Sequence, residues 1–77
     1  MISQRSAVLI DLATAYAGQR HIEHACELLV TTLDIASQSG LAEMIRRIIN
    51  VRRHIGSVDS LTVRRLDDQI QTVVLRA

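Results

Sequence analysis

The sequence predicts an all-α fold in which four helices form two antiparallel helical hairpins within a single domain, residues 1–77. Apolar residues recur every three or four positions along most of the chain, as they do on the buried side of a helix. The three glycines, at positions 18, 40 and 56, each follow such a stretch. The chain has no proline and one aromatic residue, whereas strands favour aromatic and β-branched residues. We therefore expect helices over residues 4–17, 21–38, 41–55 and 60–76.

The first predicted helix has most of its apolar residues on one side and Asp11 and Thr14 on the other. The apolar set consists of Val8, Leu9, Leu12, Ala13, Ala15 and Tyr16. Gly18 follows, and a helix commonly ends in a left-handed residue that glycine adopts without a Cβ penalty. We therefore expect this apolar side to be buried and the helix to end at Gly18.

The second predicted helix has a wider apolar surface than the first. Its main sector consists of Ile22, Ala25, Cys26, Leu29, Val30, Leu33 and Ala36. Leu28 and Ile35 extend this sector sideways, so the helix should contact neighbours on two sides. Cys26 lies in the middle of the sector with no base beside it to activate a thiolate, so we expect a small buried apolar residue.

The third predicted helix has a broad apolar arc made of Leu41, Met44, Ile45, Ile48, Ile49, Val51 and Ile55. Arg52 lies near the middle of that arc. Because an unpaired buried charge is costly, its guanidinium must reach water or a carboxylate. The candidate carboxylates are Asp34, Asp59, Asp67 and Asp68.

The fourth predicted helix has the narrowest apolar stripe, formed by Val63, Leu66, Ile70, Val73 and Val74. A helix that is apolar inward and polar outward is typical of the cap of a helical array. Asp59 or Ser60 is expected to cap its N-terminus, and Ser39 or Gly40 that of the third helix.

The sequence predicts neither catalysis nor a cofactor. It has no Ser-centred nucleophile elbow, no Gly-rich phosphate loop and no paired carboxylates. His21 and His24 have a spacing that suits a metal, but no third ligand is fixed by spacing, so we expect ordinary exposed histidines. The prediction is therefore a protein that is not an enzyme and holds no metal.

Charge and hydropathy narrow the choice of partners. The net charge of +1 is too small to indicate attraction to nucleic acid or to a membrane surface. No apolar run approaches the roughly 18 residues of a membrane span, and Met1 to Arg5 lack the pattern of a signal peptide. We expect a cytoplasmic location. The apolar content of 48% is high for so short a chain, which indicates association or a longer parent protein.

The first half of the chain resembles the tetratricopeptide repeat, a helical pair of about 34 residues. The resemblance rests on the spacing of Leu9, Leu12, Ala13, Tyr16, Ile22, Ala25 and Leu29. It implies a repeat-like hairpin over residues 4–38, in which Ala13 and Ala25 make the close helix contact and Tyr16 lies at the elbow. Residues 41–76 would then form a second hairpin whose last helix caps the array.

Taken whole, the stretch LATAYAGQRHIEHACELLVTTLDIASQSG followed by IRRIINVRRHI is similar to the C-terminal part of actinobacterial Cro/repressor-type transcriptional regulators. Those proteins join a DNA-binding domain to a tetratricopeptide-like array. The resemblance implies the sensing or assembly part of a bacterial regulator, which binds a peptide, a protein or another copy of itself.

These observations predict a protein–protein or peptide interaction module. In such arrays the first helix of each pair lines the concave binding face. The residues predicted to contact a partner are Asp11, Thr14, Asn50, Arg46 and Arg53.

Two alternatives remain open. One is a structural unit that forms a homodimer through its spare apolar residues, Leu28, Ile35, Leu61 and Leu75. The other is an accessory nucleic-acid contact through the arginines of residues 46–53 and 64–65. The low net charge disfavours direct nucleic-acid binding.

Overall fold

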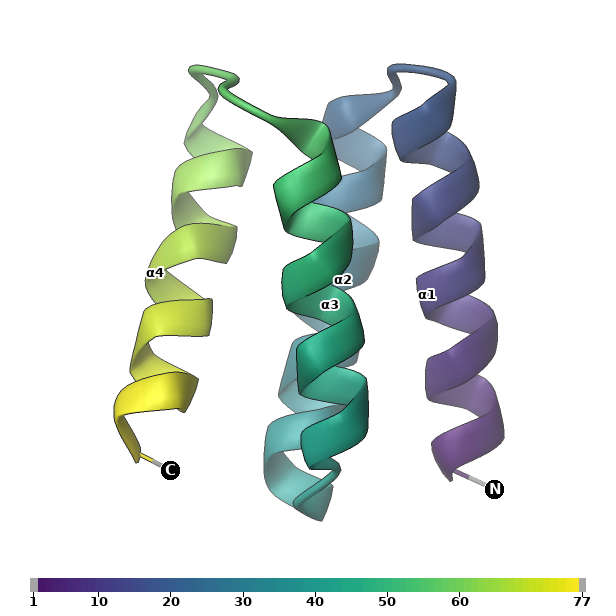
Figure 1. Ribbon diagram of the computed structural model, residues 1–77, viewed down its shortest axis with the longest axis vertical. Helices are drawn as coiled ribbons and strands as arrows, with labels where there is room; N and C mark the ends of the chain where they lie inside the picture. Colours follow the sequence, from purple (N-terminus) through teal and green to yellow (C-terminus); the bar gives the residue numbers. More distant parts are fainter. Residues whose placement is uncertain (1, 77) are drawn as a thin grey trace.

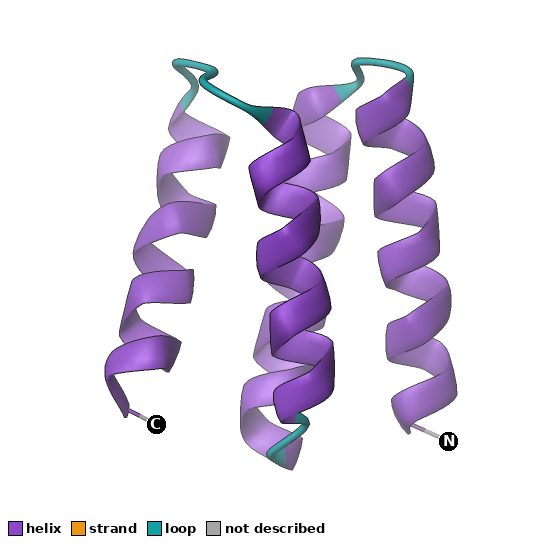
Figure 2. Ribbon diagram, in the orientation of Figure 1, coloured by secondary structure: helices purple, strands orange, loops and turns teal. Residues whose placement is uncertain are grey.

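The computed structural model describes the backbone of residues 2–76 and the side chains of residues 5–75. Within this range the chain forms four helices and no strand, which confirms the all-α part of the predicted fold class (Figure 2). The helices are α1 (Ile2–Gly18), α2 (Ile22–Ser39), α3 (Ala42–Ile55) and α4 (Leu61–Arg76). None of these four helices is long and apolar enough to cross a membrane.

Helix α2 is the element on which the other three pack (Figure 1). Helices α1 and α4 flank α2, and α3 lies in front of it. Helices α1 and α3 are also in contact and run in the same direction. The wide apolar surface of α2 therefore packs against neighbouring helices on more than one side, as its sequence predicts. Helix α4 runs antiparallel to α3, but its closest backbone contacts are with α2.

The core lies where α2 meets the other helices. Its members are Ile10, Ala13, Ala17, Ala25, Cys26, Leu29, Leu33, Ile48, Val51, Ile55, Val63 and Leu66. The predicted apolar sectors of α2, α3 and α4 supply most of this list. Cys26 is fully buried as expected, and burial raises the pKa of its thiol, which favours the uncharged form.

The buried side of α1 differs from the predicted one. Ser6, Ile10, Ala13 and Ala17 face inward, whereas Val8 is 64% exposed and Leu12 is 43% exposed. Helix α1 contacts both α2 and α3, so its buried side is the one between these neighbours. Apolar residues surround most of this helix, and their spacing alone does not say which side meets a partner.

The turn after α1 places the left-handed residue at Arg20 rather than at Gly18. Helix α1 continues through Gly18, and Arg20 has a φ of 65°. The amide of His21 donates to the Tyr16 carbonyl at 2.9 Å, and the Arg20 amide donates to that of Ala17 at 3.0 Å. These bonds form a Schellman motif, in which glycine is the usual left-handed residue.

The Tyr16 ring lies at this elbow, in edge contact with the His21 ring 6.2 Å away and tilted against the His24 ring 4.3 Å away. Both histidines are exposed, as predicted. Their rings therefore shield the elbow from outside.

The other two turns use glycine as the left-handed residue. Gly40 ends α2 with a φ of 66°, and Gly56 has φ 79° and ψ −160°, a combination open essentially to glycine alone. The prediction that Ser39 or Gly40 caps α3 is wrong, because the N-cap is Leu41 and makes no side-chain bond. Ser60 does cap α4, where its Oγ accepts a hydrogen bond from the Thr62 amide at 3.2 Å.

Arg52 finds one of its predicted carboxylates. Its Nε and Nη2 donate to the two oxygens of Asp67 at 2.6 and 3.0 Å, and Nη1 donates to the Gly56 carbonyl at 2.8 Å. The Arg52 side chain is only 20% exposed. The pair therefore joins α3 to α4. These two helices are consecutive in the chain, but the backbone of α4 packs mainly against α2.

Candidate functional site

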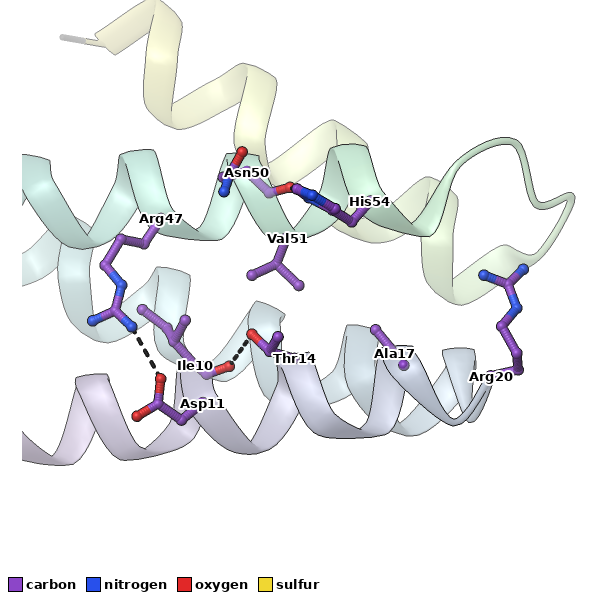
Figure 3. A pocket seen from close by; sticks show the side chains of 10 residues that line it. Ile10, Asp11, Thr14, Ala17, Arg20, Arg47, Asn50, Val51 and His54 are labelled. Carbon is purple, nitrogen blue, oxygen red and sulfur yellow. Dashed lines mark hydrogen bonds and ion pairs between the residues drawn. The ribbon is translucent and has the colours of Figure 1, made fainter.

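A groove of about 560 Å³ lies between α1 and α3 (Figure 3). Asp11 and Thr14 line it from α1, and Arg47, Asn50 and His54 line it from α3. Its floor is apolar and consists of Ile10, Ala17 and Val51. The groove thus has polar walls above an apolar base.

The geometry of two parallel helices explains why these residues meet. Arg47, Asn50 and His54 are spaced by three and four positions, so they share one side of α3. Asp11, Thr14 and Gly18 have the same spacing and share one side of α1. Because α1 and α3 lie side by side, the two stripes face each other.

An ion pair crosses the groove toward its N-terminal end. Arg47 Nη2 donates to Asp11 Oδ1 at 3.0 Å, with the Asp11 side chain 74% exposed. A pair this accessible to solvent contributes little to stability, because water and salt screen it. Each charge still has a partner, so this end of the groove is close to neutral.

The opposite end of the groove carries Arg20, which has no ion pair among the described residues. His54 and Gly18 also line the groove. The Arg20 guanidinium reaches the Ile55 carbonyl at 3.5 Å, and His54 Nδ1 lies 2.8 Å from the Asn50 carbonyl. No carboxylate lines this end in the part of the chain that the structure describes.

The predicted partner-contacting residues separate into two groups. Asp11, Thr14 and Asn50 line the groove together. Arg46 and Arg53 are exposed but do not line the groove, and Arg46 pairs with Glu43 at 3.0 Å. Both lie one helical turn from Asn50, so they border the groove-lining stripe of α3. Arg47 lines the groove and Arg52 pairs with Asp67, so the arginines of residues 46–53 do not form one surface.

Seven residues that line the groove were not among those predicted to contact a partner: the floor residues Ile10, Ala17 and Val51, together with Gly18, Arg20, Arg47 and His54. Arg47 and His54 could have been found from their spacing to Asn50. No signal in the sequence marked Arg20, because its position depends on where α1 ends.

The residues predicted for self-association do not form one patch. Leu28 and Ile35 are half-buried on α2, whereas Leu61 and Leu75 are 71% and 78% exposed. These two leucines are fourteen residues apart on α4, which corresponds to about 21 Å along a helix. The exposed apolar side chains that lie one turn apart are Val8 and Leu12 on α1.

No group of three or more metal-ligating side chains occurs among the described residues. The arrangement of the groove is instead suited to hydrogen bonding and charge recognition. Searches against family models, curated proteins and solved structures find no match to this chain.

Proposed function

We propose that this chain is a protein or peptide interaction module of a bacterial regulatory protein, acting in the cytoplasm, and that the α1–α3 groove is its binding surface. The observation that supports this most directly is the meeting of Asp11, Thr14 and Asn50 in one groove. These residues are predicted to contact a partner because first helices line the concave face of tetratricopeptide-like arrays. Helices α1 and α3 are the first helices of the two predicted hairpins.

The chemistry of the groove agrees with a peptide ligand. Extended peptides expose backbone amides and carbonyls that need partners, and the Asn50 amide offers both donors and an acceptor. The Thr14 hydroxyl donates to the Ile10 carbonyl at 2.8 Å, and its oxygen can still accept a hydrogen bond. The floor of Ile10, Ala17 and Val51 supplies apolar area for side chains of the ligand.

Selection from a random peptide library displayed on phage tests this function. Peptides recovered on the immobilised chain are synthesised, and their affinities are measured by fluorescence polarisation. Thr14→Ala combined with Asn50→Ala removes two polar groups from the groove and should weaken binding about tenfold. The matched control, Arg46→Ala with Arg53→Ala at positions of α3 that do not line the groove, should change affinity less than about twofold. A larger loss of affinity in the control variant than in the Thr14/Asn50 variant would exclude the groove as the binding surface.

A homodimer is the second candidate, and the exposure of Val8 and Leu12 favours it. Exposed apolar side chains one turn apart on a helix are typical of a helix–helix contact. Molar mass by light scattering over a dilution series should then fall from dimer to monomer. The change Leu12→Ser should shift that transition to higher protein concentration. A monomer at every concentration would exclude this candidate.

A further inference from the structure

Two residues at the C-terminal end of α1 are poorly suited to their own backbone. Gly18 is helical, a conformation in which alanine is more stable, and a Cβ there would meet no atom within 4 Å. Packing therefore does not require glycine at this position. Arg20 has a φ of 65°, which glycine adopts far more easily. Residues that conflict with local backbone preferences are commonly found at functional sites.

Both residues line the α1–α3 groove and lie two positions apart in the chain. Gly18 leaves the helix backbone uncovered, so a ligand can approach it closely. Arg20 extends its guanidinium across the end of the groove toward the turn after α3. Its one hydrogen bond among the described residues is the 3.5 Å contact with the Ile55 carbonyl, which is long. Most of its five N–H donors are thus available to a ligand.

Charge distinguishes this end from the rest of the groove. Arg47 is neutralised by Asp11, whereas Arg20 has no ion pair in the described part of the chain. Glu23 and Glu27 share a second hollow with Arg20. The Glu23 carboxylate, however, already accepts hydrogen bonds from two hydroxyl groups at the start of α4.

We infer that the end of the groove formed by Gly18, Arg20 and His54 binds a carboxylate of an extended partner segment. This inference rests on the proposed function and names the chemistry of the ligand. The planar guanidinium of Arg20 matches a carboxylate with two parallel hydrogen bonds. From Asp11 to Arg20 the groove follows about 14 Å of helix, a length that about four extended residues span.

A purely structural role for Arg20 predicts a different outcome. Helices α1 and α3 both end here, and cations stabilise helix C-termini. If that were the reason for the arginine, Arg20→Gly would lower the melting temperature. If the arginine is retained for a ligand, Arg20→Gly relieves the left-handed backbone and raises the melting temperature. Gly18→Ala should raise it also, since alanine is the better helix former.

The binding test uses blocked hexapeptides of sequence Gly-Ser-Glu-Glu-Ser-Gly and Gly-Ser-Gln-Gln-Ser-Gly, titrated into the 15N-labelled chain and followed by NMR. The glutamate peptide should bind about tenfold more tightly, because hydrogen bonds to an ionised group are the stronger ones. The glutamine peptide with a free C-terminus distinguishes a terminal carboxylate from a side chain. Gly18→Ala should weaken both glutamate binding and terminal-carboxylate binding, because its methyl group occupies open space in the groove near Arg20.

Arg20→Gly should abolish the preference for glutamate, and the control Arg53→Ala should leave it intact. Equal binding of the blocked peptides, or a preference that survives Arg20→Gly, would overturn the inference. The two proposals fail separately. Library peptides that depend on Thr14 and Asn50 but show no preference for carboxylates would leave the proposed function standing.

Discussion

Arg52 illustrates at the scale of one residue how this small fold accommodates a charge on an apolar side of a helix. Three of its nitrogen atoms donate hydrogen bonds, two of them to Asp67. The Asp67 hydrogen bond raises the pKa of Arg52 further, so the guanidinium stays charged. The sequence identifies the need for a partner, but four aspartates are available, and only the packing of α4 selects Asp67.

We predict that Asp67→Asn destabilises the fold by about 1–2 kcal/mol, because it leaves a mostly buried guanidinium without its counter-charge. This loss of stability is smaller than is usual when a buried ion pair is broken, because the Asp67 side chain is 48% exposed and water partly screens its charge. Urea unfolding measures the change. Asp68→Asn on the neighbouring exposed position is the control and should have almost no effect. Equal stability of both variants would mean that the Arg52 pair contributes nothing.

Ser6 presents the opposite situation. Its side chain is fully buried, and its Oγ has no hydrogen-bond partner among the described residues. Burying an unpaired hydroxyl is costly, and alanine is a better helix former. Ser6→Ala should therefore raise the free energy of unfolding by up to about 1 kcal/mol. A loss of stability in thermal unfolding would show that the hydroxyl has a stabilising partner.

At the scale of the element, the N-termini of α2 and α4 are joined by one carboxylate. Glu23, in the first turn of α2, accepts hydrogen bonds from Ser60 Oγ at 2.5 Å and from Thr62 Oγ1. Ser60 is also the N-cap of α4. These hydrogen bonds lower the pKa of Glu23 below its ordinary value, with the Ser60 bond contributing most.

This lowered pKa predicts a specific dependence of stability on pH. The folded chain favours the ionised carboxylate, so the stabilisation is complete above the ordinary carboxyl pKa and is lost as the pH falls through the lowered one. Glu23→Gln should therefore lower the melting temperature at pH 7, and the difference from the unchanged chain should shrink as the pH falls below the ordinary carboxyl pKa. Glu27→Gln, one turn further along α2, is the matched control. A difference in melting temperature that does not change with pH would contradict the lowered pKa of Glu23.

The helices themselves were predictable from local signals, and their faces were only partly so. Glycines at 18, 40 and 56 and the apolar spacing give boundaries within two residues of the observed ones. The inward face of α1 was not predictable, because Val8 and Leu12 are as apolar as Ile10. Which of these three residues is buried depends on where α3 lies. Three of the ten residues that line the groove, Asp11, Thr14 and Asn50, were predicted, because they lie at outward positions on the first helix of each predicted hairpin.

At the scale of the whole molecule, the fold is a thin slab. Its principal extents are 29 × 25 × 15 Å, so it is about two helices thick. A slab of this shape has too much surface to cover all its apolar side chains, and Val8, Leu61 and Leu75 are left exposed. Its stability therefore depends on the close packing of the few residues that α2 shares with its neighbours.

Ala25 is the residue whose enlargement should disturb that packing most. It is fully buried on α2, in the same core as Ala13 of α1, and α1 and α2 pack closely together. Ala25→Leu should overpack the contact and lower the free energy of unfolding by about 1–3 kcal/mol. Ala15→Leu on the exposed side of α1 should be neutral. Unchanged stability of the Ala25 variant would contradict the close approach of these two helices.

The central claim is that the partner of this chain binds between α1 and α3, and NMR mapping tests it most directly. The 15N-labelled chain is titrated with a peptide recovered from the library selection. The account predicts that the largest changes in amide chemical shift occur at Thr14, Gly18 and Asn50. Changes centred instead on Leu12 or on Arg53, neither of which lines the groove, would place the binding surface elsewhere and contradict the account.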